Sequence, residues 1–196
     1  MALVRSILFV DGENLTFRYQ ELLGEGKKPR AEVSHLPDVY VWSTFIQRTR
    51  LINTDILRIN YYTSMVGADD ELGKVKNEIS QLLFSTGAGD LYGYCQLYPR
   101  VYKKLKKSMK SRLVDINIVI DMMRHCYTDA VDVVYLLSGD GDFLNLVEEI
   151  ARSGKKVCLG AFSSGLDPRL RSAVDRFFSL DDIYFEPTPP AAGAAV

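Results

Sequence analysis

The chain of 196 residues contains few cysteines, and they form no CxxC pair. Cys95, Cys126 and Cys158 lie far apart, which argues against a disulfide framework and against a structural zinc site. The simplest interpretation is that all three are buried free thiols in a reducing cytoplasm.

Long hydrophobic runs are also missing. The longest apolar runs, at residues 7–10 and 133–137, are much shorter than the roughly 20 residues that a membrane-spanning helix needs. The apolar stretch before Asp11 is too short for the hydrophobic region of a secretory signal. We therefore expect a soluble, cytoplasmic protein with no membrane partner.

The composition is that of an ordinary folded domain, with 47% hydrophobic and 25% charged residues. The length suits one domain. Because the last residues are rich in alanine and proline, we expect one domain over residues 1–185 and a flexible tail over residues 186–196.

Alternating hydrophobic patterns predict an α/β fold. Expected strands cover residues 6–10, 55–64, 92–101, 131–137 and 156–162. Expected helices cover residues 13–23, 36–50, 71–86, 114–127, 143–152 and 167–177, with the one at 114–127 buried. The strand at 92–101 is placed at an edge because Pro99 lacks a backbone donor. This alternation favours a mostly parallel central sheet with helices on both faces and ligands beyond the carboxyl ends of the strands.

Acidic residues follow the two most apolar of these strands. Asp11 ends the run at 6–10, and Asp140 and Asp142 come soon after 131–137. If the two strands are parallel neighbours, the three carboxylates gather at one edge of the sheet, where adjacent glycines permit tight turns.

Two further aspartates, Asp115 and Asp121, lie on the expected helix between these strands. Asp115 is at the helix start, where it could reach the same edge of the sheet. Asp121 follows after about one and a half turns, so the two aspartates do not share a helix face cleanly.

Carboxylates that converge without lysines between them repel one another, and a hard divalent cation such as Mg²⁺ or Mn²⁺ relieves that repulsion. Such a cation also activates water for attack on a phosphodiester. Asn14 lies one helical turn after Asp11, where its amide could orient that water or a phosphate. These residues favour metal-assisted hydrolysis.

Basic residues are concentrated between Arg100 and Arg112, a stretch with no acidic residue. A lysine-rich segment beside an acidic metal centre suits a polyanionic substrate, because the cationic side chains can hold the backbone phosphates. The predicted nucleic-acid contacts are Lys103, Lys104, Lys106, Lys107, Lys110 and Arg112.

Simpler structural roles stay open for several of these residues. Asp142 and Asp115 each stand near a helix start and could be N-caps. Asp121 could be a buried acid paired with Arg124. The basic segment could be a solvated surface loop, which is the usual role of such runs. The two histidines have no partner at a recognisable spacing and are assigned no catalytic role.

The motifs after the two strands are Asp11-Gly12-Glu13-Asn14 and Ser138-Gly139-Asp140-Gly141-Asp142-Phe143. Together they resemble the NYN domain, the LabA-like branch of the PIN-like nucleases. Val114-Asp115-Ile116 followed by Asp121 resembles the central helix of that family. The segment with Leu170, Asp175, Arg176, Phe177 and Phe178 resembles its closing helix. The resemblance extends over roughly residues 6–185.

This resemblance implies a PIN-like three-layer α/β/α fold, an acidic pocket that binds Mg²⁺ or Mn²⁺, and a ribonuclease activity. It implies attack by water that leaves a 5′-phosphate and a 3′-hydroxyl, on RNA, with DNA left open as a substrate. The implied catalytic residues are Asp11, Asn14, Asp115, Asp140 and Asp142. The implied metal ligands are Asp11, Asp115, Asp121, Asp140 and Asp142.

The chain departs from the family pattern just before Asp115. The family commonly has Lys-Gly there, whereas this chain has Arg112-Leu113. Arginine keeps the positive charge, but the conformational freedom of glycine is lost. The departure therefore concerns the backbone geometry around Asp115.

Three functions compete. The leading hypothesis is a divalent-metal-dependent nuclease acting on RNA. The second is an RNA-binding or regulatory module with little or no turnover, and a homodimer or a protein partner fits either of these. The third is a phosphohydrolase of the haloacid-dehalogenase type, which needs a second aspartate two residues after Asp11, where this chain has Glu13.

Overall fold

The fold of the chain is given by a computed structural model, which describes all residues except 1–3, 50–53, 86–93, 107–110 and 188–196. Most of the tail expected at residues 186–196 lies outside the described residues, as do Lys107 and Lys110.

The described elements alternate between strands and helices along most of the chain. The strands are β1 (Arg5–Asp11), β2 (Val33–Leu36), β3 (Tyr40–Ser43), β4 (Asp55–Met65), β5 (Leu83–Ser85), β6 (Tyr94–Lys103), β7 (Val133–Leu137), β8 (Lys156–Ala161) and β9 (Arg176–Ser179). The α-helices are α1 (Gly12–Gly24), α2 (Asp69–Gln81), α3 (Arg112–Tyr127), α4 (Leu144–Arg152), α5 (Pro168–Ala173) and α6 (Asp181–Tyr184). Two short 3-10 helices are η1 (Thr44–Thr49) and η2 (Gly141–Phe143).

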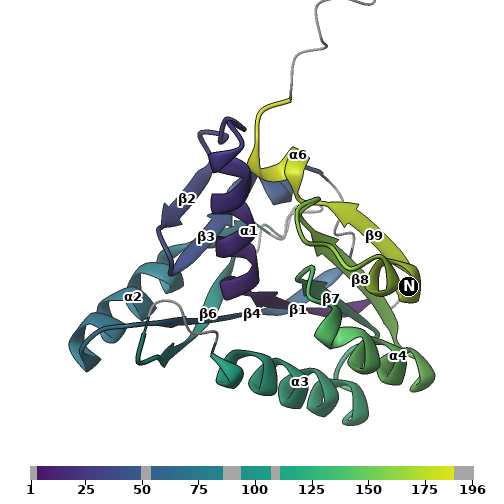
Figure 1. Cartoon of the computed structure of the whole chain (residues 1–196). Coiled ribbons are helices and arrows are strands. Elements are labelled where there is room, and N and C mark those ends of the chain that lie inside the picture. Colours follow the sequence, from purple (N-terminus) through teal and green to yellow (C-terminus); the bar gives the residue numbers. More distant parts are fainter. Residues whose placement is uncertain (1–3, 50–53, 86–93, 107–110, 188–196) are drawn as a thin grey trace, which may run out of the picture.

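A seven-stranded sheet organises the described residues, with the strand order β5-β6-β4-β1-β7-β8-β9. The strands from β6 to β9 in this order are parallel, and only the short β5 pairs antiparallel to its neighbour. Figure 1 shows α1 on one side of the sheet and α3 and α4 on the other. The predicted mostly parallel α/β fold with helices on both faces is therefore confirmed.

Strand β1 lies at the centre of the sheet and is buried on both faces. Leu8 and Val10 belong to the core on the α1 side, and Phe9 belongs to the core beneath α3 and α4. All three side chains are 0% exposed, and full burial of one such side chain contributes about 1.5–3 kcal/mol. The strand is thus fixed in register. Its last residue, Asp11, is held at a defined position where the parallel strands end, which we call the carboxyl edge of the sheet.

The helix predicted over residues 36–50 is wrong in its first half. Residues up to Ser43 form the β2–β3 hairpin, whose turn contains Asp38 in the left-handed region at φ 61°. The hydroxyl of Tyr61 bonds both backbone groups of Val41, each at 3.0 Å, so a contact with β4 satisfies this backbone in an extended form. Helical spacing holds only from Thr44 onward, where η1 forms.

The helix predicted over residues 167–177 ends early, and a strand follows it. Helix α5 ends at Ala173, and β9 begins at Arg176. Phe177 packs on the core beneath α3 and Phe178 on the opposite core, which is the alternation of a strand. The side chain of Asp175 also accepts a hydrogen bond from the backbone of Val157 in β8 at 2.8 Å, which fixes the start of β9.

Two further expectations are partly wrong. Strand β6 is not the edge strand, because β5 pairs with it from Tyr94 to Gln96. Pro99 lies beyond that pairing, opposite Tyr61 of β4, so its missing donor interrupts no bond to β5. The helix predicted at 71–86 ends at Gln81, before β5.

Helix α3, predicted as buried, is buried on one face only. Val114, Ile118 and Met122 are 0% exposed and pack on the sheet. Ile116 and Ile120 lie on the opposite face and are 51% and 46% exposed. The sequence alone does not distinguish the buried face from the exposed face, because both carry aliphatic residues.

The three cysteines are free thiols, as predicted, but only two of them are buried. Cys126 and Cys158 are buried and Cys95 is half-buried. Burial raises the pKa of the Cys126 thiol to about 11, so this thiol is unreactive at neutral pH. Within the described ranges, none of the helices has the length and apolar content that crossing a bilayer requires.

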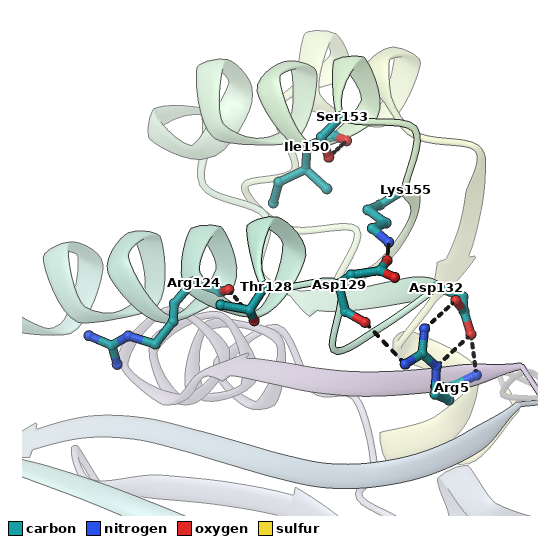
Figure 2. Close-up of polar contacts among 8 residues, drawn as sticks. All are labelled: Arg5, Arg124, Thr128, Asp129, Asp132, Ile150, Ser153 and Lys155. Atoms are coloured by element: carbon teal, nitrogen blue, oxygen red, sulfur yellow. Dashed lines mark hydrogen bonds and ion pairs between the residues drawn. The ribbon is translucent and has the colours of Figure 1, made fainter.

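An ionic cluster stabilises the amino edge of the sheet, where the parallel strands begin (Figure 2). Strand β1 starts there with Arg5 and ends with Asp11 at the opposite side. Arg5, at the start of β1, donates side-chain hydrogen bonds of 2.9 and 3.2 Å to the carboxylate of Asp132, which precedes β7. Its guanidinium also donates to the carbonyl of Asp129 at 3.0 Å, and Lys155 pairs with the carboxylate of Asp129. These contacts align the two strands whose far ends carry the candidate site.

Asp132→Asn should lower the free energy of unfolding at pH 6 and have a smaller effect at pH 3. Hydrogen bonds from Arg5 lower the pKa of Asp132 in the folded protein to about 2, below the value of about 3.9 in an unfolded chain. The stabilisation is therefore present above the unfolded pKa and is lost as the pH falls toward the folded one. Urea unfolding of both proteins across this range measures the effect.

The exposed Asp70 of α2 offers a matched control, since Asp70→Asn should cost little at either pH. A stability difference between wild type and Asp132→Asn that is as large at pH 3 as at pH 6 would contradict the account.

Candidate active site

Asp11 is the residue around which the carboxyl edge is built, and it is 0% exposed. Its Oδ1 accepts a hydrogen bond from the backbone N–H of Asn14 at 3.1 Å, which makes it the N-cap of α1. Its Oδ2 accepts a hydrogen bond from the hydroxyl of Ser138 at 2.8 Å. Because Val10 of β1 lies opposite Leu137 of the parallel strand β7, the two strand ends meet at one edge, which is the condition that the sequence analysis set for a shared site.

Asn14 connects the first turn of α1 to the loop after β7. Its side-chain oxygen accepts a hydrogen bond from the backbone N–H of Gly139 at 3.0 Å. This bond fixes which end of the amide faces the loop. The NH₂ group is therefore the part of the Asn14 side chain that could contact a phosphate or a water.

Asp140 is held by the same loop. Its backbone N–H donates to the hydroxyl of Ser138 at 3.2 Å, and its Oδ1 accepts a hydrogen bond from the backbone N–H of Asp142 at 3.0 Å. Asp140 is thus the N-cap of η2. The N-cap of α4 is Phe143, so the sequence alternative that made Asp142 the N-cap of that helix is wrong. The side chain of Asp142 is exposed beside it.

The loop after β8 packs tightly on this turn, and sequence reasoning missed it. A Cβ at Gly141 would lie 2.1 Å from Oδ2 of Asp167, so any side chain there would displace the carboxylate of Asp167. The backbone N–H of Asp167 donates to the carbonyl of Gly139 at 3.0 Å. Hydrogen bonds from Arg169 lower the pKa of Asp167 to about 2, so this carboxylate is ionised and already paired.

Asp115 lies in the first turn of α3 and is half-buried. The N-cap of α3 is Ser111, so the alternative that made Asp115 the cap is wrong. Across the part of the chain that the structure describes, no three Asp, Glu, His or Cys side chains are grouped so that they could hold a metal ion. The carboxyl edge therefore presents carboxylates from three elements without a closed ligand set.

Asp121 is bonded to cations and to a tyrosine. Arg124 approaches its Oδ1 at 3.0 Å, while Arg100 at 3.1 Å and the hydroxyl of Tyr62 at 2.7 Å approach its Oδ2. The pairing with Arg124 that the sequence offered as an alternative is confirmed. Burial, together with the bond to Asp121, raises the pKa of Tyr62 well above its ordinary value, so Tyr62 stays a donor.

Glu13 connects four elements at this edge and was not predicted as a site residue. Its Oε1 accepts hydrogen bonds from Lys104 at 3.1 Å and from the hydroxyl of Ser64 at the end of β4. Its Oε2 accepts a hydrogen bond from the backbone N–H of Ser111, at the start of α3, at 3.1 Å. The only sequence signal was its place between Asp11 and Asn14 in the first motif.

The basic segment divides between structural and exposed positions. Lys104 is 11% exposed and pairs with Glu13, so it helps to hold the fold together. Lys103 pairs with Asp69 at 2.9 Å and is 54% exposed. Lys106 and Arg112 are exposed near the carboxyl edge. The predicted contacts Lys107 and Lys110 lie outside the described residues.

Glu13→Gln should lower the free energy of unfolding by about 2 kcal/mol, because Lys104 would lose its anionic partner in a largely buried position. The added Lys104→Met change should recover part of that loss, because it removes the unpaired charge. Urea unfolding measures both effects through the midpoint at unchanged slope. Glu25→Gln, at an exposed position after α1, is the matched control. A midpoint for Glu13→Gln equal to that of the control would show that the contact adds no stability.

Comparisons with known proteins give a relative of part of the chain and a solved structure of similar fold. "Low amplitude and bright protein LabA" of Synechococcus elongatus is 34% identical over 70 residues, which are 36% of this chain and 37% of that protein. The match thus spans little more than a third of that relative. The crystal structure of a protein of unknown function from Vibrio parahaemolyticus has a TM-score of 0.63 at 20% identity, over 94% of this chain and 97% of that one. That likeness shows the fold.

The model of the NYN domain matches residues 5–181. The match includes both strand-end motifs, the whole of α3 and the loop that packs on Gly141. It therefore covers every described element that contributes to the carboxyl edge. The chain belongs to the NYN domain family, within the PIN-like nuclease superfamily.

Proposed function

We propose that this chain is a divalent-metal-dependent ribonuclease that hydrolyses phosphodiester bonds at the carboxyl edge of its sheet. The observation that carries the proposal is that the hydroxyl of Ser138, just after β7, donates to the carboxylate of Asp11 and accepts from the backbone N–H of Asp140. This contact holds the two acidic residues beside the ends of two neighbouring parallel strands. Membership of the NYN family supports it, because that family belongs to the PIN-like nucleases.

The donor atoms at this edge fit Mg²⁺ or Mn²⁺, since carboxylate and amide oxygens are the ligands that hard cations prefer. Asp11 and Asp140 would be ligands from the strand ends, joined by Asp115 from α3 and by the exposed Asp142. Magnesium commonly uses one or two carboxylates and completes its shell with water and substrate phosphate. A closed group of three protein ligands is therefore not required.

Asp121 would act on this centre from a distance. Both of its carboxylate oxygens already accept bonds, from Arg124 on one side and from Tyr62 and Arg100 on the other. These arginines are cationic and would repel a divalent cation at the same oxygens, whereas the donors that hold Asp11 are neutral. We therefore place Asp121 in a supporting role, beneath the ligands contributed by the strand ends.

A cation bound at this edge would withdraw charge from the scissile phosphate and activate the attacking water. The residues of the chain position the reactants. Ser138 and the Asn14 backbone hold the carboxylate of Asp11, and the Asp142 backbone holds that of Asp140. The NH₂ group of Asn14 would donate to a phosphate oxygen. Groups fixed in this way lower the entropic cost of reaching the transition state.

Exposed basic side chains near the carboxyl edge would hold the phosphates of the RNA backbone. Lys106 and Arg112 are exposed, and Lys103 is half-exposed beside Asp69. Lys107 and Lys110 stay predictions of the same kind. Contacts of this type position the strand without selecting its sequence, so they leave open which RNA is cut and whether DNA is also a substrate.

A second candidate function is RNA binding with little turnover. Two observations favour it: the described carboxylates form no closed metal-binding group, and two arginines neutralise Asp121. A protein of this kind would bind RNA at the same edge and release it uncut. Cleavage assays separate the two functions directly.

Asp140→Asn should reduce cleavage of a labelled single-stranded RNA in Mn²⁺ or Mg²⁺ by roughly 100-fold or more, because it removes one of the carboxylates that would hold the cation. Asparagine is also a good N-cap, so η2 should keep its shape. Product formation on a sequencing gel, with DNA of the same sequence in parallel, gives the rate and the preferred polymer.

Asp70→Asn serves as the matched control, because it removes an equal charge at an exposed site on α2. Equal cleavage by wild type and Asp140→Asn would refute the proposed site. No cleavage by wild type, with RNA binding retained, would favour the binding module.

A further inference from the structure

Strand β6 presents polar and aromatic side chains on the face of the sheet opposite α2. Leu97 and Val101 pack into the core on the α2 side. Because side chains alternate along a strand, Tyr98, Arg100 and Tyr102 point to the other face, the one on which α3 packs. Tyr98 is 46% exposed and the side chain of Arg100 is 43% exposed.

Neighbouring elements add to this surface. Arg58 of β4 is exposed and belongs to the same face as Tyr62, which lies opposite Arg100. Arg124 reaches Asp121 from α3, on the side of that helix that faces β6. We define the β4–β6 face as Arg58, Tyr98, Arg100, Tyr102 and Arg124.

Positive charge dominates the β4–β6 face. Burial and then the charges of Arg58, Arg124 and Arg100 lower the pKa of His125, and Asp121 opposes them. All three arginines therefore act on one small region, together with a single carboxylate among the named charges. Asp121 is 4% exposed, so the negative charge is covered while the arginines are accessible. A polyanion would meet the cations first.

On the same face, two arginine side chains lie close to tyrosine rings. The guanidinium of Arg58 lies 4.4 Å from the centre of the Tyr98 ring, and that of Arg100 lies 5.7 Å from the centre of the Tyr62 ring. Exposed aromatic rings next to arginines are the groups that bind single-stranded nucleic acid, because rings stack on bases while cations hold phosphates. A duplex, whose bases are already stacked on one another, offers no such partner.

The β4–β6 face leads toward the carboxyl edge. Helix α3 begins at that edge, where Ser111 bonds Glu13, and it runs along the sheet on the side opposite α1 (Figure 1). Asp121 follows Asp115 by six residues, which is about 9 Å along the helix axis. A strand bound beside Arg100 and Arg124 would therefore lie close to the proposed site of cleavage.

We propose that the β4–β6 face binds an unpaired segment of the RNA substrate, with phosphates on the three arginines and a base stacked on Tyr98. The proposal rests on the proposed function for its choice of RNA. It adds that recognition requires an unpaired segment, and that this segment lies along α3 in addition to any contact with the lysine-rich segment.

Tyr98→Ala should weaken binding of a labelled 12-nucleotide single-stranded RNA by about 5- to 30-fold, and Tyr98→Phe should bind like wild type. Arg58→Gln should weaken binding and flatten the dependence of log Kd on log salt by about 0.7. Fluorescence anisotropy without divalent cations, so that no cleavage occurs, measures both. A duplex of the same sequence should bind more weakly and be insensitive to Tyr98→Ala.

Matched controls are Tyr127→Ala and Arg152→Gln, which alter an exposed tyrosine at the far end of α3 and an exposed arginine of α4. Both should bind RNA like wild type. Circular dichroism confirms that each variant is folded. Wild-type affinity in Tyr98→Ala and Arg58→Gln would overturn the proposal, as would equal losses in the controls or failure of wild type to bind single-stranded RNA.

Cleavage in Mn²⁺ separates this proposal from the proposed function. If wild type cuts RNA and the Tyr98 and Arg58 variants bind and cut equally well, RNA binding by the β4–β6 face is refuted and the proposed nuclease activity is supported. If RNA binding depends on both residues but neither wild type nor the variants cut RNA, binding by the β4–β6 face is supported and the proposed nuclease activity is refuted. Equal affinity for single-stranded DNA supports the face, because stacking and phosphate contacts do not distinguish the sugars.

Discussion

Asp11, which has no solvent contact, ends the central strand β1. The burial of its carboxylate must be compensated, because an unpaired buried charge is strongly destabilising. Ser138 and the backbone of Asn14 donate to the two oxygens of Asp11. Those two bonds couple β1, α1 and the loop after β7, and Gly139 closes the set by donating to Asn14. The arrangement of the carboxyl edge follows from this one requirement.

Glu13 extends the same constraint to the other half of the molecule. Through Lys104, Ser64 and Ser111 it ties α1 to the ends of β6 and β4 and to the start of α3. Asp115 is four residues beyond Ser111, so its position depends on that contact. Asp11 and Glu13 therefore place the acidic residues of α3 and of the β7 loop relative to one another. The proposed chemistry uses an edge whose geometry these two side chains set.

The hydrophobic runs and the acidic motifs were sufficient to predict two buried strands with acidic residues after them. The pairing of β1 with β7 entered the sequence analysis only as a condition, and the structure shows that it is met. The runs and motifs could not reveal that Glu13 pairs with Lys104, because 91 residues separate the partners and no local pattern records the contact. The β2–β3 hairpin was mistaken for a helix for a similar reason, since the hydroxyl of Tyr61 decides the conformation around Val41. Long-range polar contacts account for most of what the sequence concealed.

The most direct test of the central claim is the binding of Mn²⁺ in solution, followed by the loss of the free-ion signal in electron paramagnetic resonance. We expect the wild-type chain to bind Mn²⁺ and the folded Asp11→Asn variant to bind it much more weakly, because the removed charge lies at the centre of the carboxyl edge. Equal Mn²⁺ binding by the two proteins would contradict the account, since the cation would then be held elsewhere in the molecule.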